Sequence, residues 1–172
     1  MIFKKLGLRN FKRYKDLSEF DLEVKNKNQN IILIEALNGI GKTSFLQAIN
    51  GCLFGLSESS FKKFLNESRE KDELGQYFIE MSLEYINPRE KEHIRIYRKY
   101  FTKNSDLNNV NLIFEISVNG AVKDISEEDW LYDIEDFIPK EISKFFFFDG
   151  ERIQQLIDPR NKQELKIANE KK

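Results

Sequence analysis

Cysteine and histidine are almost absent from this 172-residue chain, which contains one residue of each. A single cysteine, Cys52, excludes an internal disulfide and suits a reducing compartment, so we expect a cytoplasmic protein. A single histidine, His93, excludes a metal site built from several histidines. His93 lies in a charged, strand-like segment, and we expect it at the surface.

Long hydrophobic runs and an excess of one charge are also missing. No apolar stretch approaches the roughly 20 residues needed to cross a membrane, and the N-terminus does not resemble a secretory signal, so we expect no membrane partner. With 28 Lys and Arg against 29 Asp and Glu, the formal net charge is −1. Any contact with DNA must therefore come from a local basic patch. The length is sufficient for one well-buried domain.

The strongest positive signal is the segment Ala-Leu-Asn-Gly-Ile-Gly-Lys-Thr at residues 36–43. It follows an apolar run at residues 31–34, which is typical of a central strand buried on both faces. It precedes residues 44–54, whose apolar spacing predicts a helix. A strand, a glycine-containing loop and a helix in this order are the context of a phosphate-binding loop. Ala36 replaces the usual first glycine, and the alternative is a turn that caps an ordinary helix.

Each residue type in this loop suits the binding of a nucleotide. Backbone N–H groups of the loop and the N-terminus of the following helix attract anions. Lys42 would reach the outer phosphates, and the hydroxyl of Thr43 would bind Mg²⁺. The sequence therefore predicts a nucleotide and Mg²⁺ as ligands, and the family resemblance given below implies that the nucleotide is ATP. The candidate nucleotide-binding residues of the loop are Asn38, Gly39, Ile40, Gly41, Lys42, Thr43 and Ser44.

The rest of the chain predicts strands more often than helices. Alternating apolar residues predict strands at residues 2–11, 20–24, 77–86, 93–101 and 112–118. Asn119-Gly120 is a strong hairpin signal before a further strand at 121–125, and Ser126 is the expected N-cap of a helix that ends near Phe137. Antiparallel strands directly after the phosphate-loop helix differ from the parallel β-α-β units of kinase-like enzymes.

Three segments resemble the N-terminal half of an ABC-type ATPase head of the structural-maintenance-of-chromosomes (SMC) class. They are Asn-Phe-Lys-Arg-Tyr at residues 10–14, the phosphate loop with the helix after it, and Phe-Phe-Phe-Phe-Asp-Gly-Glu-Arg-Ile at residues 145–153. The third segment, together with residues 125–130, is similar to the DndD family, the SMC-like ATPases of bacterial DNA phosphorothioation. Related anti-phage ATPases carry similar segments.

The resemblance implies a fold class and a division of the chain. The fold would be α/β, the N-terminal lobe of a P-loop NTPase of the ABC-ATPase/SMC head type, with an antiparallel β subdomain and leading into a coiled coil. Residues 1–158 would form the half-head, and residues 159–172 would begin the helical extension.

The resemblance also assigns roles outside the loop. Arg13, with Lys12, would contact nucleotide phosphates, whereas the alternative is a solvated basic turn. Asp149 occupies the position of the glutamine that senses Mg²⁺ and the attacking water, and it would be catalytic together with Lys42. In a second interpretation, Asp149 is the Mg²⁺-binding acid at a strand end and Glu151 polarises the water. Weaker candidates are Gln154 and Gln155.

The implied partners follow from the same resemblance. The C-terminal half of the head would supply the signature loop and the catalytic glutamate, so the isolated chain should bind ATP weakly and hydrolyse it poorly. Two heads would form a homodimer around two ATP molecules. Other subunits of a DNA-modification or defence complex and DNA itself would be further partners.

Alternatives are an SMC-like DNA-repair or other anti-phage ATPase and, in a different class, a small P-loop kinase. The candidate DNA contacts are Lys62, Lys63, Arg95, Arg98 and Lys99.

Overall fold

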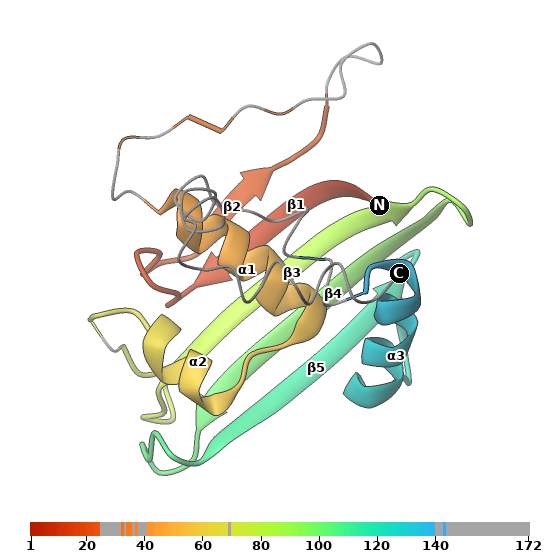
Figure 1. The fold of residues 1–172 in the computed structure, drawn as a ribbon. Coiled ribbons are helices and arrows are strands. Elements are labelled where there is room, and N and C mark those ends of the chain that lie inside the picture. The colour runs from red at the N-terminus through yellow and green to blue at the C-terminus, as the bar shows by residue number, and fades with distance from the viewer. Residues whose placement is uncertain are drawn as a thin grey trace, which may run out of the picture.

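The computed structural model describes residues 1–24, 32, 34–35, 37, 41–68, 70–139 and 143. Within this part, six strands form one antiparallel sheet in the order β2-β1-β3-β4-β5-β6 (Figure 1). The strands are β1 (Ile2–Arg9), β2 (Ser18–Asp21), β3 (Phe78–Asn87), β4 (Glu92–Thr102), β5 (Val110–Val118) and β6 (Ala121–Lys123).

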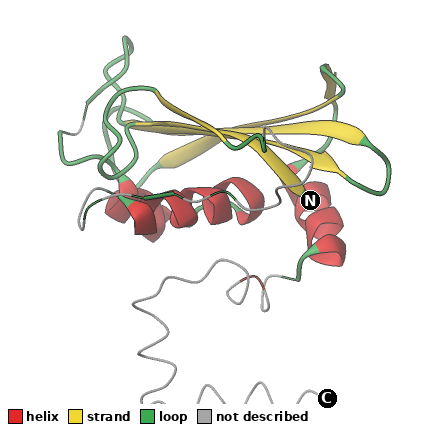
Figure 2. Cartoon of the chain, turned by 90° about the horizontal axis from the view of Figure 1, so that it is seen from above, coloured by secondary structure: helices red, strands yellow, loops and turns green. Residues whose placement is uncertain are grey.

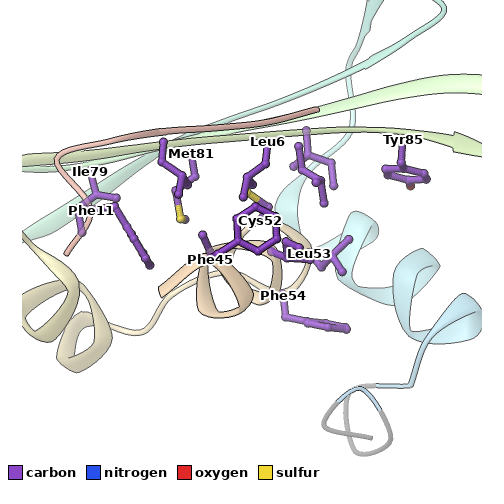
Figure 3. Packing of buried hydrophobic residues seen from close by; sticks show 14 of the residues in the cluster. Leu6, Phe11, Phe45, Cys52, Leu53, Phe54, Ile79, Met81 and Tyr85 are labelled. Atoms are coloured by element: carbon purple, nitrogen blue, oxygen red, sulfur yellow. The ribbon is translucent and has the colours of Figure 1, made fainter. Parts of the chain in front are cut away.

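In the described part of the chain, three helices cover one face of this sheet, and none of them covers the other, which we call the open face (Figure 2). They are α1 (Lys42–Phe54), α2 (Glu58–Phe64) and α3 (Glu127–Phe137). The core lies between the helices and the sheet, where Leu6 and Met81 point from the strands towards Phe45, Cys52 and Leu53 of α1 (Figure 3). Cys52 is a buried core residue, and burial raises the pKa of its thiol to about 12.

Alternation along the central strands separates the core face from the open face. On β3, Ile79, Met81 and Leu83 are buried, and the residues between them are only partly covered. The open face carries ion pairs between strands, such as Arg95 Nε with Glu84 Oε1 at 3.8 Å. His93 also lies at this surface, with its Nε2 3.3 Å from Glu84 Oε2, which confirms the expected position.

Local signals in the sequence correspond to local structure. Asn119 and Gly120 have φ of 53° and 83°, the positive values that a two-residue type I′ turn requires between β5 and β6. The Ser126 hydroxyl accepts a hydrogen bond from the Asp129 N–H at 3.1 Å and caps α3. Gly55 ends α1 with φ of 79°.

The predicted central strand at residues 31–34 is the main error in the fold. Ile32 and Ile34 lie outside any strand and are 43% and 42% exposed. An apolar strand is buried on both faces only where neighbouring strands flank it and helices cover it. The described sheet pairs no strand with these residues. Residues 31 and 33, the aromatic run at 145–148 and the proposed extension at 159–172 lie outside the described residues.

Candidate phosphate-binding site

The N-terminus of α1 has the properties of an anion site. Gly41 is the N-cap residue, and its carbonyl accepts a hydrogen bond from the Phe45 N–H at 2.9 Å. Among the described residues, no side chain caps this end by a hydrogen bond, and no acidic residue lies in the first turn. The positive end of the helix dipole therefore has no carboxylate against it in the first turn, which favours an anionic ligand.

Gly41 is held in a conformation that only glycine adopts readily. Its φ is 122°, and a Cβ placed there would lie 2.9 Å from the hydroxyl oxygen of Tyr14. The Tyr14 hydroxyl donates a hydrogen bond to the Gly41 carbonyl at 3.1 Å. Burial raises the pKa of Tyr14, so this hydroxyl keeps its proton around neutral pH. Tyr14 thus fixes the backbone at the start of the helix.

The three candidate residues at the start of α1 differ in exposure. Lys42 is exposed, and its Nζ donates a hydrogen bond to the carbonyl of Leu37 at 3.2 Å. The lysine side chain is therefore directed towards Leu37, which precedes the helix in the sequence. Thr43 is half-buried, and Ser44 is 7% exposed. Asn38, Gly39 and Ile40 lie outside the described residues.

A tight turn after β1 brings a second set of residues to α1. Phe11 and Tyr14 exchange two backbone hydrogen bonds of 2.8 Å, which leaves Lys12 and Arg13 at the tip of the turn. Behind the turn, Asn10 is fully buried, and its side-chain amide donates to the carbonyls of Glu70 at 3.0 Å and Phe78 at 2.7 Å. The turn is therefore anchored to the start of β3 rather than free in solvent.

The structure separates the roles of Lys12 and Arg13. Lys12 Nζ hydrogen-bonds the side-chain carbonyl of Gln47 on α1 and lies 4.6 Å from the centre of the Phe64 ring. Burial lowers the pKa of Lys12, with a smaller contribution from Lys63. Arg13 is exposed at the tip of the turn. Lys12 is thus the residue that ties the turn to the helix, and Arg13 is the one left available for a ligand.

Aromatic side chains complete the connection between the turn and α1. The ring of Tyr14 packs edge-on against Phe20 of β2 at 5.4 Å, and Phe20 packs edge-on against Phe45 of α1 at 5.2 Å. The sequence did not single out Tyr14, Gln47 or Asn10 as site residues. Tyr14 lies inside the quoted segment 10–14, so a signal for it was present, whereas Gln47 shows none.

The basic residues predicted to contact DNA lie in three different environments. Arg98 is fully buried, so its assignment as a DNA contact is wrong. Arg95 and Lys99 lie on the open face of the sheet beside carboxylates of Glu84 and Glu80. Lys62 and Lys63 are exposed on α2, and within the described part of the chain neither forms an ion pair with a carboxylate.

A magnesium site made of protein ligands alone is not found in the residues that the structure describes. These residues contain no group of three or more His, Cys, Asp or Glu side chains that could hold a metal ion. The hydroxyl of Thr43 at the helix N-terminus suits an Mg²⁺ ion that takes most of its other ligands from phosphate and water. Asp149 lies outside the described residues.

A family model described as an AAA domain matches residues 5–172. The chain belongs to the AAA domain family. Matches to this AAA domain are found in 36 chains of known structure. One of them is a chain from work on ATP-driven dimerization and DNA-stimulated activation of SMC ATPases. The two share 19% identity and a TM-score of 0.53, over 92% of this chain and 98% of that one. The comparison with curated proteins gives no match.

The family and the shared fold agree with the expected fold class. This AAA domain shares its overall fold with a chain from an SMC ATPase, and its described part contains one six-stranded antiparallel sheet. In the described segments, no helix has both the length and the apolar character needed to span a membrane.

Proposed function

We propose that this AAA domain binds ATP with Mg²⁺ at the N-terminus of α1 and forms part of an ATPase whose cycle acts on DNA. The observation that carries the proposal is the geometry around Gly41 and Lys42. A glycine with φ of 122° precedes a helix that has no acidic residue in its first turn, and Lys42 Nζ donates a hydrogen bond to the Leu37 carbonyl. This combination fits phosphates and not a cationic or neutral ligand.

Each residue has a specific role in this proposal. Lys42 neutralises the outer phosphates after leaving the Leu37 carbonyl, and Thr43 ligates Mg²⁺. Arg13, exposed at the tip of the turn, contacts the phosphates from the other side of the helix end. Backbone groups of Asn38, Gly39, Ile40 and Ser44 complete the cradle. Asp149 acts on the Mg²⁺ ion or the attacking water.

The oligomeric state and the partners form a second level of the proposal. The C-terminal half of the head supplies the remaining catalytic groups, and two heads enclose two ATP molecules as a homodimer. The similar SMC ATPase is described with ATP-driven dimerization and DNA-stimulated activation, which supports the homodimer and a contact with DNA. Lys62 and Lys63 are the DNA contacts best supported by their surroundings, because they are exposed and have no ion-paired carboxylate among the described residues.

The biological setting is the finest level. The segments at 125–130 and 145–153 support a DndD-like ATPase of DNA phosphorothioation or phage defence in the cytoplasm, with a coiled coil after residue 158. An anti-phage or DNA-repair ATPase of the same architecture is the alternative. The reading frame beyond residue 172 separates these from the kinase alternative, because only an SMC-like protein continues into a long heptad region and a signature loop.

A hydrolysis assay tests the activity. The chain should hydrolyse ATP when combined with the C-terminal half of the head, at a rate that DNA increases, and poorly when alone. Lys42→Ala should abolish hydrolysis in the complete head, whereas Lys91→Ala, in the β3–β4 turn, should leave it unchanged. Equal hydrolysis by wild type and Lys42→Ala would disprove the proposed role of the loop. Substantial turnover by the isolated chain would disprove its dependence on the C-terminal half.

A further inference from the structure

Side chains from β4 and α3 bind the C-terminal end of α1, far from the phosphate loop. Arg98 Nε donates a hydrogen bond to the Cys52 carbonyl at 2.9 Å, and Trp130 Nε1 donates one to the Leu53 carbonyl at 3.1 Å. The Leu56 N–H donates to the Tyr100 hydroxyl at 2.8 Å. The two carbonyls belong to the last turn, where backbone groups have no partner within the helix. Other elements therefore hold this helix end directly.

Arg98 is a charged residue placed where burial is costly. It is fully buried, and its Nη1 forms an ion pair with Glu127, the first residue of α3. Its guanidinium lies 4.5 Å from the centre of the Phe114 ring. Among the described residues, Arg98 Nη2 has no hydrogen-bond partner. A buried ion pair seldom stabilises a fold more than well-packed apolar side chains do. Stability alone therefore does not account for an arginine here.

Gly55, the residue after α1, lies directly against this cluster. Gly55 has φ of 79°, and a Cβ placed there would lie 2.9 Å from Glu127 Oε1 and 3.3 Å from the Tyr100 hydroxyl. The guanidinium also lies at the negative end of the helix dipole, where a positive charge is favoured. We call Arg98, Tyr100, Glu127 and Trp130 the α1 clamp. Because the clamp contacts fit closely, α1 cannot shift along its axis without moving them.

The clamp and the phosphate loop lie at opposite ends of one rigid element. At 1.5 Å per residue, the 13 residues of α1 span about 20 Å from Lys42 to the clamp. A ligand at the helix N-terminus would contact the same helix whose last-turn carbonyls accept hydrogen bonds from Arg98 and Trp130. Glu127 and Trp130 belong to α3, so the clamp connects α1 to α3, which lies on the same face of the sheet (Figure 1).

We propose that the α1 clamp couples nucleotide occupancy at the phosphate loop to the position of α3, with Arg98 as a positioning residue that acts through α1. This inference rests on the proposed function, since it requires a phosphate ligand at the N-terminus of α1. It adds a route by which that ligand changes the position of α3 at the opposite end of α1. A purely structural role of Arg98 would affect stability but not this coupling.

The chain carries its own reporter for the test. Trp130 is the only tryptophan, so its fluorescence reports on the clamp. It is 6% exposed, and its indole N–H bonds α1 directly. Titration with Mg·ATP should change the emission of Trp130 along the same saturation curve as binding measured by equilibrium dialysis. Magnesium pyrophosphate should cause a smaller change of the same sign, because it offers phosphates without the nucleoside.

Three variants separate coupling from stability. Arg98→Met removes the guanidinium but keeps an apolar side chain of similar length, and it should abolish the emission change and weaken ATP binding about fivefold or more. Glu127→Gln keeps the shape of a half-exposed residue and should reduce the response even if Arg98→Met does not fold. Arg98→Lys should restore part of the response. Arg89→Met is the matched control, because Arg89 contacts Phe137 of α3 without touching α1.

Each outcome decides a different claim. If ATP binds but Trp130 emission stays constant in the wild type, the coupling is disproved and the proposed function stands. If Arg98→Met or Glu127→Gln responds as the wild type does, the clamp is structural only. If dialysis detects no binding at millimolar Mg·ATP to the wild type combined with the C-terminal half, the proposed function fails and the coupling fails with it.

Discussion

Replacing Gly41 by alanine is the sharpest test of the local geometry at the phosphate loop. The φ of 122° lies in a region that side-chain-bearing residues rarely adopt, and the new Cβ would lie 2.9 Å from the Tyr14 hydroxyl oxygen. Backbone strain of this kind costs about 1–3 kcal/mol. The displaced tyrosine would also lose its hydrogen bond to the Gly41 carbonyl, worth about 1 kcal/mol.

The two costs act on different measurements. If the variant takes on this strain only when it adopts the ATP-binding conformation, the strain weakens binding. A cost of about 1–3 kcal/mol then corresponds to a loss of about 5-fold to 150-fold in ATP affinity. The lost hydrogen bond, about 1 kcal/mol, should lower the melting temperature by about 2–4 °C. Equilibrium dialysis with Mg·ATP measures the affinity, and calorimetry measures the melting temperature.

Two further variants show whether the reasoning holds. Gly41→Ala combined with Tyr14→Phe removes the clashing hydroxyl but keeps the strain and still lacks the hydrogen bond, so neither the stability nor the affinity should return to the wild-type value. Gly75→Ala is the matched control, because Gly75 has φ of 73° and nothing within 4 Å of an added Cβ. Gly75→Ala should lower stability slightly and leave ATP binding intact. Wild-type affinity in Gly41→Ala would refute the requirement for glycine.

The remaining predictions concern the buried contacts around α1. Asn10→Ala should destabilise the domain by about 2–4 kcal/mol in urea unfolding, because it leaves two buried backbone carbonyls without donors; an unchanged midpoint would contradict the anchoring of the turn. Trp130→Phe should cost about 1 kcal/mol in the same assay, since it removes one hydrogen bond to the last turn of α1. Cys52, with a pKa raised to about 12, should resist iodoacetamide at pH 8 in the native protein and react only after unfolding; rapid native labelling would place it at the surface.

Signals that depend on a few neighbouring residues predicted the structure well. The hairpin at Asn119-Gly120 and the cap at Ser126 are each decided by backbone preferences within four residues. Alternating apolar residues likewise predicted strands β3, β4 and β5. The burial of these strands comes from helices of the same chain, because α1 and α3 cover them.

Burial that depends on distant residues could not be predicted. The apolar run containing Ile32 and Ile34 has the composition of a central strand, yet its burial requires neighbours that the described sheet does not provide. Arg98 lies in a basic stretch of a strand, and alternation alone does not reveal that its partners come from α1, 46 residues earlier in the sequence, and from α3, 29 residues later. Arg98, one of the five residues predicted to contact DNA, therefore belongs to the interior.

The candidate site shows the same division. The spacing of Gly41, Lys42 and Thr43 was sufficient to place a phosphate loop at a helix N-terminus, where the structure finds the last glycine and the helix start. The turn at residues 10–14 was also recognised, but Lys12 and Arg13 are adjacent and chemically similar. Only the fold decides that Lys12 contacts Gln47 and that Arg13 stays exposed.

Binding of Mg·ATP to the wild type and to Lys42→Ala, each combined with the C-terminal half of the head, tests the central claim most directly. Removal of the ammonium deletes charge-assisted contacts worth about 1.5–3 kcal/mol, so affinity should fall about 10-fold to 150-fold. Because Lys42 is exposed, the melting temperature of the free variant should remain within about 2 °C of the wild type. Equal affinities for the two proteins would contradict a triphosphate site at the start of α1.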